Sequence, residues 1–283
     1  MSVLLDAGMI RHVYADGGTA LDGCSLSIRR GSRNALLGSN GSGKTTLLKH
    51  FNGLLRPASG TVRLDGVPLD YSRQGLHALR RRVGLVFQNP DHQLFSASVA
   101  EDVSFGPLNL GLGEATVRRR VAEALAAVDM KAEAERPVHH LSFGQKKRVC
   151  IAGVLAMRPD VLLLDEPMSG LDAGMQAELL VVLDELAANG ITIVLSTHDI
   201  DFAYRWADDM HLLAAGRCIA TFPAADLSAR AAALGAAGLP LPAVIELHRV
   251  LAQRGILDGG TVPRSFEQLL ASLTAKESLC NIA

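Results

Sequence analysis

The glycine-rich segment at residues 38–45, GSNGSGKT, constrains the fold of this chain more than any other feature. A short apolar run at residues 35–37 precedes it and predicts a buried strand, and residues 45–54 predict a helix. Glycines let successive backbone N–H groups turn toward one point, and the following helix directs its positive N-terminus to that point. The order strand, glycine loop, helix therefore predicts a phosphate-binding loop.

The residues of this loop have different expected roles. Lys44 should reach the β- and γ-phosphates of a nucleotide, and the hydroxyl of Thr45 should bind Mg²⁺. The residues expected to bind the nucleotide here are Gly38, Ser39, Asn40, Gly41, Ser42, Gly43, Lys44, Thr45 and Thr46. Such a loop occurs in ATPases, kinases and GTPases, and therefore it does not by itself select one of these classes.

The second motif is an apolar strand that ends in two carboxylates, at residues 161–167, VLLLDEP. Asp165 lies where a ligand of Mg²⁺, direct or through water, is expected. Glu166 follows it and is free to face an attacking water molecule as a general base. Alone, the segment fits an ordinary buried strand equally well, but its position after the glycine loop favours the catalytic interpretation.

Strand and helix patterns alternate along most of the chain. Strands are predicted at residues 83–88, 161–164 and 191–195, and helices at residues 114–130 and 176–188. This alternation predicts an α/β fold with a mostly parallel core sheet covered on both faces. Short strands in residues 2–37 and a β-ribbon at residues 61–67 predict an N-terminal antiparallel β part.

The remaining residues predict two helical additions to this sheet. Residues 89–159 are rich in helix patterns and predict a helical subdomain inserted into the sheet. We therefore expect one domain over residues 1–224 and a small appended element over residues 225–283. Helices are predicted in that element at residues 242–253 and 266–276.

Composition and charge limit the partners of this chain. Of its 283 residues 48% are hydrophobic, and the net charge of −1 at pH 7 argues against electrostatic binding of nucleic acid. No apolar run approaches the roughly 20 residues that span a bilayer, and no basic leader is visible, so we expect any membrane role to depend on a partner. The scattered cysteines predict free thiols in a reducing compartment; they are Cys24, Cys150, Cys218 and Cys280.

A third motif selects the class of protein. Residues 141–145, LSFGQ, precede a predicted helix at residues 146–156 and resemble the LSGGQ signature of ABC ATPases. The resemblance covers residues 3–222, and the motifs follow the order of that family. It implies that Tyr14 stacks on adenine, that Gln88 approaches Mg²⁺ and senses a membrane partner, that Asp172 belongs to a D-loop, and that His198 holds the γ-phosphate.

This resemblance also implies a nucleotide site shared by two copies arranged head to tail. Ser142 and the backbone N–H of Gly144 in one copy would contact the γ-phosphate held by Lys44 of the other. The signature residues acting across the dimer are Leu141, Ser142, Phe143, Gly144 and Gln145. ATP would close the dimer and hydrolysis would loosen it. The family usually has glycine at position 143, but we expect activity to survive because the neighbours of Phe143 supply the phosphate contacts.

Finer resemblance indicates an importer of the energy-coupling-factor type, a group that imports transition metals or vitamins. Residues 86–95, VFQNPDHQLF, resemble its extended Q-loop, and residues 241–256 resemble the tail that pairs its ATPases. The similarity favours the ATPase subunit of a cobalt importer, with nickel or vitamin import as alternatives. No residue of this chain is predicted to bind cobalt. A non-transport ABC ATPase is another alternative, although the long coiled coil or tandem cassettes usual there are missing.

The resemblance implies partners as well. We expect a second ATPase subunit, most simply another copy, together with transmembrane scaffold and substrate-capture subunits. These would hold the chain at the cytoplasmic face of the cell membrane as a peripheral protein. Helices of the scaffold would bind the segment after Gln88 and follow its rigid-body motion.

Overall fold

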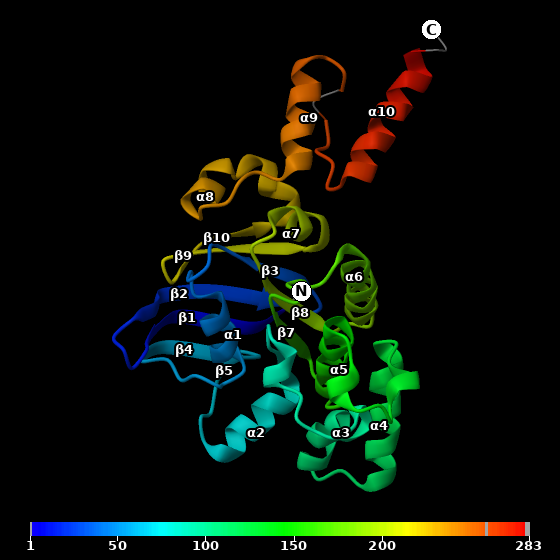
Figure 1. The fold of residues 1–283 in the computed structure, drawn as a ribbon. Helices are drawn as coiled ribbons and strands as arrows, with labels where there is room; N and C mark the ends of the chain where they lie inside the picture. Colours follow the sequence, from blue (N-terminus) through cyan, green and yellow to red (C-terminus); the bar gives the residue numbers. More distant parts are fainter. Residues whose placement is uncertain (1, 258–259, 281–283) are drawn as a thin grey trace.

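A computed structural model describes residues 2–257 and 260–280, with side chains as far as residue 274. Two β-sheets form the centre of the molecule, and helices surround them (Figure 1). The fold is the one predicted from the sequence: an antiparallel N-terminal sheet, a mostly parallel core sheet and helices around them.

The first sheet is antiparallel, with four strands in the order β2-β1-β4-β5. Its strands are β1 (Val3–Val13), β2 (Thr19–Arg29), β4 (Ser59–Leu64) and β5 (Val67–Pro68). The prediction of short strands is wrong for β1 and β2, which each span 11 residues. The pairing of β1 with β2 shifts register between Ala7 and Ile10, so the two strands stay hydrogen-bonded although the residues there do not alternate regularly between the two faces of the sheet.

The second sheet has six strands in the order β10-β9-β3-β8-β7-β6. Its strands are β3 (Arg33–Leu37), β6 (Val83–Val86), β7 (Val161–Asp165), β8 (Thr192–Thr197), β9 (Asp209–Ala214) and β10 (Arg217–Pro223). All neighbouring strands are parallel except β9 and β10. Every residue of β7 is buried, as expected of a strand covered on both faces.

Ten α-helices lie in the described residues. They are α1 (Lys44–Phe51), α2 (Arg73–Arg82), α3 (Val99–Asn109), α4 (Glu114–Ala127), α5 (Phe143–Leu155), α6 (Ala173–Ala188), α7 (Ile200–Trp206), α8 (Ala231–Ala236), α9 (Ala243–Gln253) and α10 (Phe266–Cys280). Four of them, α2, α3, α7 and α8, were not predicted as individual helices, and α7 and α8 are only seven and six residues long. In α2 only Leu79 is buried, and α3 contains Pro107, so neither shows a long apolar period.

The core has two parts, one on each side of the larger sheet. Leu47, Leu48 and Phe51 of α1 are buried in one cluster with residues of both sheets, so α1 packs between the two sheets. On the other side α3, α4 and α5 pack together through residues such as Val103, Val121 and Val149. These three helices lie within the insertion predicted at residues 89–159. Together with α2, helices α3 and α4 form the end of the molecule opposite the C-terminus, and α5 lies between them and the larger sheet (Figure 1).

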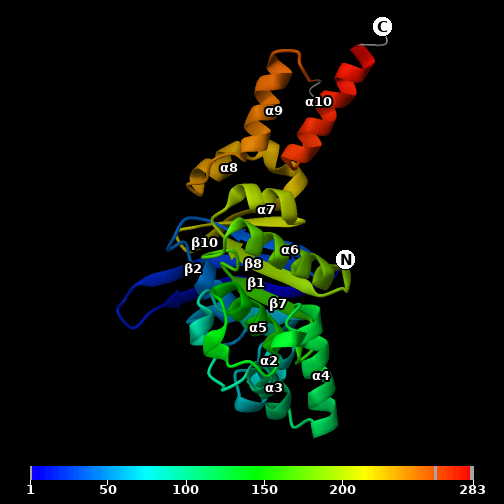
Figure 2. The same ribbon diagram turned by 45° about the vertical axis from the view of Figure 1, so that its right-hand side comes forward.

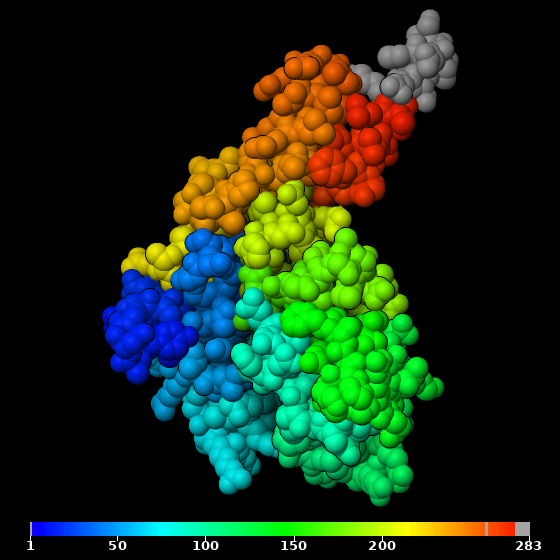
Figure 3. All heavy atoms as spheres, viewed as in Figure 1, coloured from blue at the N-terminus to red at the C-terminus, as the bar shows by residue number. Residues whose placement is uncertain are grey.

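The C-terminal helices α8, α9 and α10 extend from the far side of the larger sheet, beyond α7 (Figure 2). In the space-filling view the orange and red C-terminal residues project away from the green helical end (Figure 3). Arg264 anchors them by donating hydrogen bonds to the carbonyls of Tyr204 and Ala207. The boundary at residue 224 stays a prediction, and residues 258–259 and 281–283 of the predicted element lie outside the described part.

Two smaller predictions concern thiols and the membrane. Cys24, Cys150 and Cys218 are free, while the side chain of Cys280 lies outside the described residues. Among the described helices, none is both long and apolar enough to cross a bilayer.

Candidate active site

The carboxyl ends of β3, β7 and β8 meet at one edge of the larger sheet. Leu37 pairs with Thr197, and Asp165 pairs with Ser196. The glycine loop, Glu166 and His198 follow directly after these three strand ends. Parallel strands end at the same edge, and that edge is where ligands bind in α/β sheets.

The glycine loop leads into α1 without a side-chain cap. Gly43 precedes the helix in a left-handed conformation, and no described side chain accepts a hydrogen bond from the first turn. The first backbone N–H groups of α1 are therefore available to an anion. The tip of the loop, residues 39–41, is exposed, whereas Ser42 is buried and its hydroxyl has no partner in the described residues. This geometry fits a bound polyphosphate.

Lys44 is buried beneath this loop. Its ammonium group donates to the carbonyls of Gly38 at 2.7 Å and Ser39 at 3.1 Å, and lies 3.9 Å from a carboxylate oxygen of Glu166. Burial lowers the pKa of Lys44, and the charges of Glu166 and Asp165 act in the opposite direction. A phosphate group would give this buried cation the counter-charge that the carbonyls only partly supply.

Asp165 and Thr45 form an oxygen cluster that fits Mg²⁺. The Thr45 hydroxyl donates to Asp165, with distances of 3.0 and 2.8 Å to its two carboxylate oxygens. Carboxylate and hydroxyl oxygens are the hard ligands that Mg²⁺ prefers. Gln88 follows β6, whose last residue Val86 pairs with Leu164 beside Asp165. The residues that would hold Mg²⁺ are therefore Thr45 and Asp165. Gln88 lies two residues after the end of β6, and among the described residues no hydrogen bond joins it to either of them.

Ser196 is a residue of this cluster that the sequence did not reveal. Its hydroxyl donates to Asp165 at 2.7 Å and accepts from the backbone N–H of Glu166 at 2.9 Å. It thereby orients the carboxylate of Asp165 and the backbone of Glu166 together. The only signal in the sequence is its position at the end of β8, two residues before His198.

Glu166 and His198 face each other. The Nδ1 atom of His198 lies 3.1 Å from Oε2 of Glu166, which is mostly buried, while the side chain of His198 is exposed. Glu166 has a φ angle of 45°, which is unfavourable for a residue with a side chain. The surrounding contacts hold the carboxylate in a fixed position near Lys44, where an attacking water molecule could lose a proton to it.

Tyr14 lies beside the first turn of α1, directly after the glycine loop. Its hydroxyl hydrogen bonds with the Thr46 hydroxyl at 2.9 Å, and its ring is substantially exposed. The ring of His12 packs against it edge to face. An exposed aromatic ring beside the first turn of α1 is placed to stack on a base.

The signature residues surround the start of α5. That helix begins at Phe143, not at residue 146 as predicted, because Ser142 and Gln145 form a capping box. The Ser142 hydroxyl accepts from the Gln145 N–H, and the Gln145 side chain accepts from the Ser142 N–H. Leu141 is buried, Phe143 is partly exposed, and Gly144 lies in the first turn. Asp172 has a similar capping role at α6, where it accepts from Met175.

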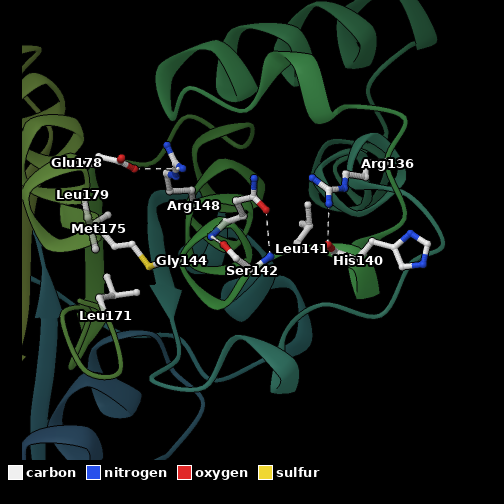
Figure 4. A pocket seen from close by; sticks show the side chains of 11 residues that line it. Arg136, His140, Leu141, Ser142, Gly144, Arg148, Leu171, Met175, Glu178 and Leu179 are labelled. Atoms are coloured by element: carbon white, nitrogen blue, oxygen red, sulfur yellow. Dashed lines mark hydrogen bonds and ion pairs between the residues drawn. The ribbon is translucent and has the colours of Figure 1, made fainter. Parts of the chain in front are cut away.

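A pocket of about 660 Å³ opens beside this helix start, between α5 and α6 (Figure 4). Ser142, Gly144, Arg136 and Arg148 line it, and none of its lining residues belongs to the glycine loop. Across the described residues, no hydrogen bond or ion pair joins residues 141–145 to residues 38–46. Within one chain the glycine loop and the signature segment therefore lie in two separate places.

Comparisons with known proteins agree with this geometry. The model of the ABC transporter family matches residues 21–169, more than half of the chain. A putative ABC transporter ATP-binding protein of Streptomyces coelicolor is 52% identical, with 91% of each chain covered. The cobalt import ATP-binding protein CbiO of Rhodobacter capsulatus is 48% identical, with 96% of this chain and 98% of that protein covered. An energy-coupling factor transporter ATP-binding protein of Methanosphaera stadtmanae is 41% identical, with 96% and 100% covered.

Solved structures give the same result. The structure of cbiO1 from Clostridium perfringens, described as part of an ABC transporter complex, has a TM-score of 0.76 at 44% identity. It matches 88% of this chain and 100% of its own. A dimeric bacterial ABC transporter cassette has a TM-score of 0.71 at 28% identity, with 78% and 99% covered. The chain belongs to the ABC transporter family of ATP-binding subunits and is an ATPase, similar to those of energy-coupling factor transporters.

Proposed function

We propose that this chain is the ATP-hydrolysing subunit of an importer of the energy-coupling-factor type, and that two copies share each nucleotide. The observation that carries this proposal is the separation of the glycine-loop half-site from the signature half-site within one chain. Two copies arranged head to tail would bring Ser142 and Gly144 of one against the γ-phosphate held by Lys44 of the other. The dimeric state of the similar solved cassette supports this arrangement.

The residues of the glycine-loop half-site suit hydrolysis of ATP. Tyr14 would stack on adenine, the backbone of residues 38–46 and Lys44 would hold the phosphates, and Glu166 would accept a proton from the attacking water. His198 would orient Glu166 and contact the γ-phosphate from its exposed position. Thr45 and Asp165 would hold Mg²⁺, with Gln88 as a further ligand, and the ion would supply charge neutralisation at the phosphate oxygens.

An apolar groove of about 1030 Å³ suits the membrane partner. Phe95 and Phe105 meet edge to face in it, 4.8 Å apart, and both are at least half exposed. Leu76, Leu85, Phe87, Val154 and Met157 line the same groove. A surface this apolar that opens next to Gln88 fits an amphipathic helix laid into it. We assign it to a helix of the transmembrane scaffold, which would hold the chain at the cytoplasmic face of the membrane.

The C-terminal helices would stabilise the pair of ATPases. Leu247 and Val250 on α9 and Phe266 and Leu270 on α10 are large apolar side chains, all more than 40% exposed. Such exposed apolar faces are typical of interaction surfaces. A dimerisation role for residues 225–283 would cover them with the same helices of a second copy.

Cobalt is the cargo that we propose, on the strength of similarity to the cobalt import ATP-binding protein of Rhodobacter capsulatus. The ion would be captured by a membrane subunit and act as substrate there. Uptake of radioactive cobalt by cells that express the chain with its membrane partners tests this cargo. Uptake of nickel or a vitamin in place of cobalt would refute it while leaving the importer assignment intact.

Mixing two inactive variants tests the shared site. Lys44→Ala disables the glycine loop, and Ser142→Arg disables the signature. In a mixed dimer one site lacks both parts, whereas the other combines the intact glycine loop of one chain with the intact signature of its partner. ATP hydrolysis above the level of either variant alone should therefore appear only on mixing, although a dimer with one intact site should stay slower than the dimer with two. If the mixture stays as inactive as each variant alone, the shared site is wrong.

Purification from detergent-solubilised membranes tests the importer assignment. A hydrophobic scaffold protein should co-purify with the tagged chain. Recovery of the chain with ribosomes or DNA, in the absence of any membrane protein, would contradict it.

A further inference from the structure

Lys147 is a buried cation that has no part in the proposed binding of the nucleotide, Mg²⁺ or the membrane partner. It lies on α5, five residues after Ser142, and only 3% of it is exposed. Its ammonium group donates to the carbonyls of Pro167 and Ser169, both at 2.6 Å, and to that of Glu166 at 3.3 Å. No carboxylate in the described residues lies within ion-pair distance of it. Burial lowers the pKa of Lys147 to about 8. A buried ammonium group that is held mainly by carbonyls lowers the stability of the folded state, because its desolvation is only partly compensated.

The ring of Phe143 also joins the start of α5 to the segment at residues 166–170. It covers Lys147, with the ammonium nitrogen 5.2 Å from the ring centroid. The same ring lies against Gly170, where an added Cβ would be 2.9 Å from Cε1 of Phe143. Gly170 has a φ angle of 76°, which also favours glycine. The start of α5 and the segment at residues 166–170 are therefore packed as one unit, and the unusual residue of the signature is part of it.

The packed unit includes a contact to the backbone of Glu166, the proposed general base. Glu166 is in an unfavourable backbone conformation and needs contacts to hold it there. Ser196 binds its N–H group from β8, and Lys147 binds its carbonyl from the signature helix. Of these two contacts only the one from Lys147 connects Glu166 to the element that would touch the partner's nucleotide.

We propose that Lys147 is a positioning residue that couples the two nucleotide sites of the dimer. This inference rests on the shared site of the proposed function. Ser142 of a chain contacts the nucleotide of its partner, while Glu166 of the same chain acts on its own nucleotide. A displacement of α5 on engagement of the partner's γ-phosphate is transmitted through Lys147 to the carbonyls of Glu166, Pro167 and Ser169. Lys147 touches no nucleotide and acts only through this backbone.

Mixed dimers measure the coupling directly. One chain carries Lys44→Ala and the other does not, and the pair is purified through two different affinity tags. In this dimer only the chain with Lys44 binds a nucleotide at its glycine loop. The signature of that same chain faces the disabled glycine loop of the Lys44→Ala chain. The measured quantity is the ATPase rate of this dimer divided by that of the dimer with two intact sites. Independent sites give one half, whereas coupled sites give a ratio below about one tenth.

Lys147→Met in both chains should raise this ratio toward one half, an increase of about fivefold or more, while the rate with two intact sites falls. A defect of structure alone lowers both rates alike and leaves the ratio unchanged. Lys146→Met is the matched control, because Lys146 lies on the same helix but pairs with Asp91. Phe143→Leu, at a partly exposed position, serves as a second variant and should shift the ratio in the same direction.

The inference is overturned if the ratio in Lys147→Met and Phe143→Leu stays at its original value, or if that original value is already one half. Either result leaves the shared site intact, since the shared site is tested separately by the appearance of activity on mixing Lys44→Ala with Ser142→Arg.

Discussion

His50 should make the folded state sensitive to mild acid. It lies on α1 with no exposed surface, and its ring is 4.9 Å from that of His12. Burial, with a smaller contribution from His12, lowers the pKa of His50 to about 4, although the backbone of Leu55 acts in the opposite direction. The folded protein thus keeps this ring neutral at a pH where the unfolded chain binds a proton.

The sign and size of the effect follow from this difference. Below pH 6.5 the unfolded chain gains a proton at His50 and the folded chain does not, so the free energy of unfolding decreases as the pH falls toward 4. The full difference is worth about 3 kcal/mol. Between pH 7 and pH 5 the loss from this one residue should be about 2 kcal/mol, a large part of the 5–15 kcal/mol typical of a folded domain.

Urea unfolding at pH 7 and at pH 5, followed by circular dichroism, measures the loss. In His50→Gln the decrease between the two pH values should be smaller by about 2 kcal/mol, whatever the stability of the variant at pH 7. His211, whose pKa burial also lowers to about 4, should behave likewise in His211→Asn. His92→Gln, a replacement of the same kind at an exposed position, serves as the matched control. An unchanged pH dependence in His50→Gln would refute the reasoning.

Three further predictions concern the site and the groove. Glu166→Gln should bind ATP but hydrolyse it about 10²- to 10⁴-fold more slowly and elute as a closed dimer in gel filtration; turnover like that of the wild type would exclude Glu166 as the base. Gly38→Ala should weaken ATP binding more than tenfold by calorimetry, about 1.4 kcal/mol or more, because a Cβ there would lie 2.2 Å from the backbone oxygen of Leu213; unaltered affinity would contradict this. Phe105→Ser should reduce co-purification of the scaffold protein by an amount equivalent to about 2 kcal/mol, whereas Val67→Ser, exposed on β5, should not; equal recovery of the scaffold in both variants would remove the groove from the interface.

The sequence by itself determined the parts of this protein whose chemistry is local. The glycine loop, the apolar strand before Asp165 and the LSFGQ segment each carry their meaning within a few consecutive residues. The resemblance of these motifs, in their order, to those of ABC ATPases indicated the family, and the alternation of strand and helix patterns predicted the α/β fold. The start of α5 was missed by three residues although Ser142 and Gln145 have the spacing of a capping box.

Only the tertiary structure decided which residues meet. Thr45 and Asp165 are 120 residues apart, and Ser196 is 31 residues beyond Asp165, yet their oxygens lie within hydrogen-bond distance. No local pattern announces such contacts, because they follow from the order of β3, β8 and β7 in the sheet and from the register between them. Lys147 gives the clearest case: in the sequence it is one cation in a basic run, and only packing against the backbone at residues 166–169 makes it buried. Long-range packing also holds Glu166 in a backbone conformation that its own residue type disfavours.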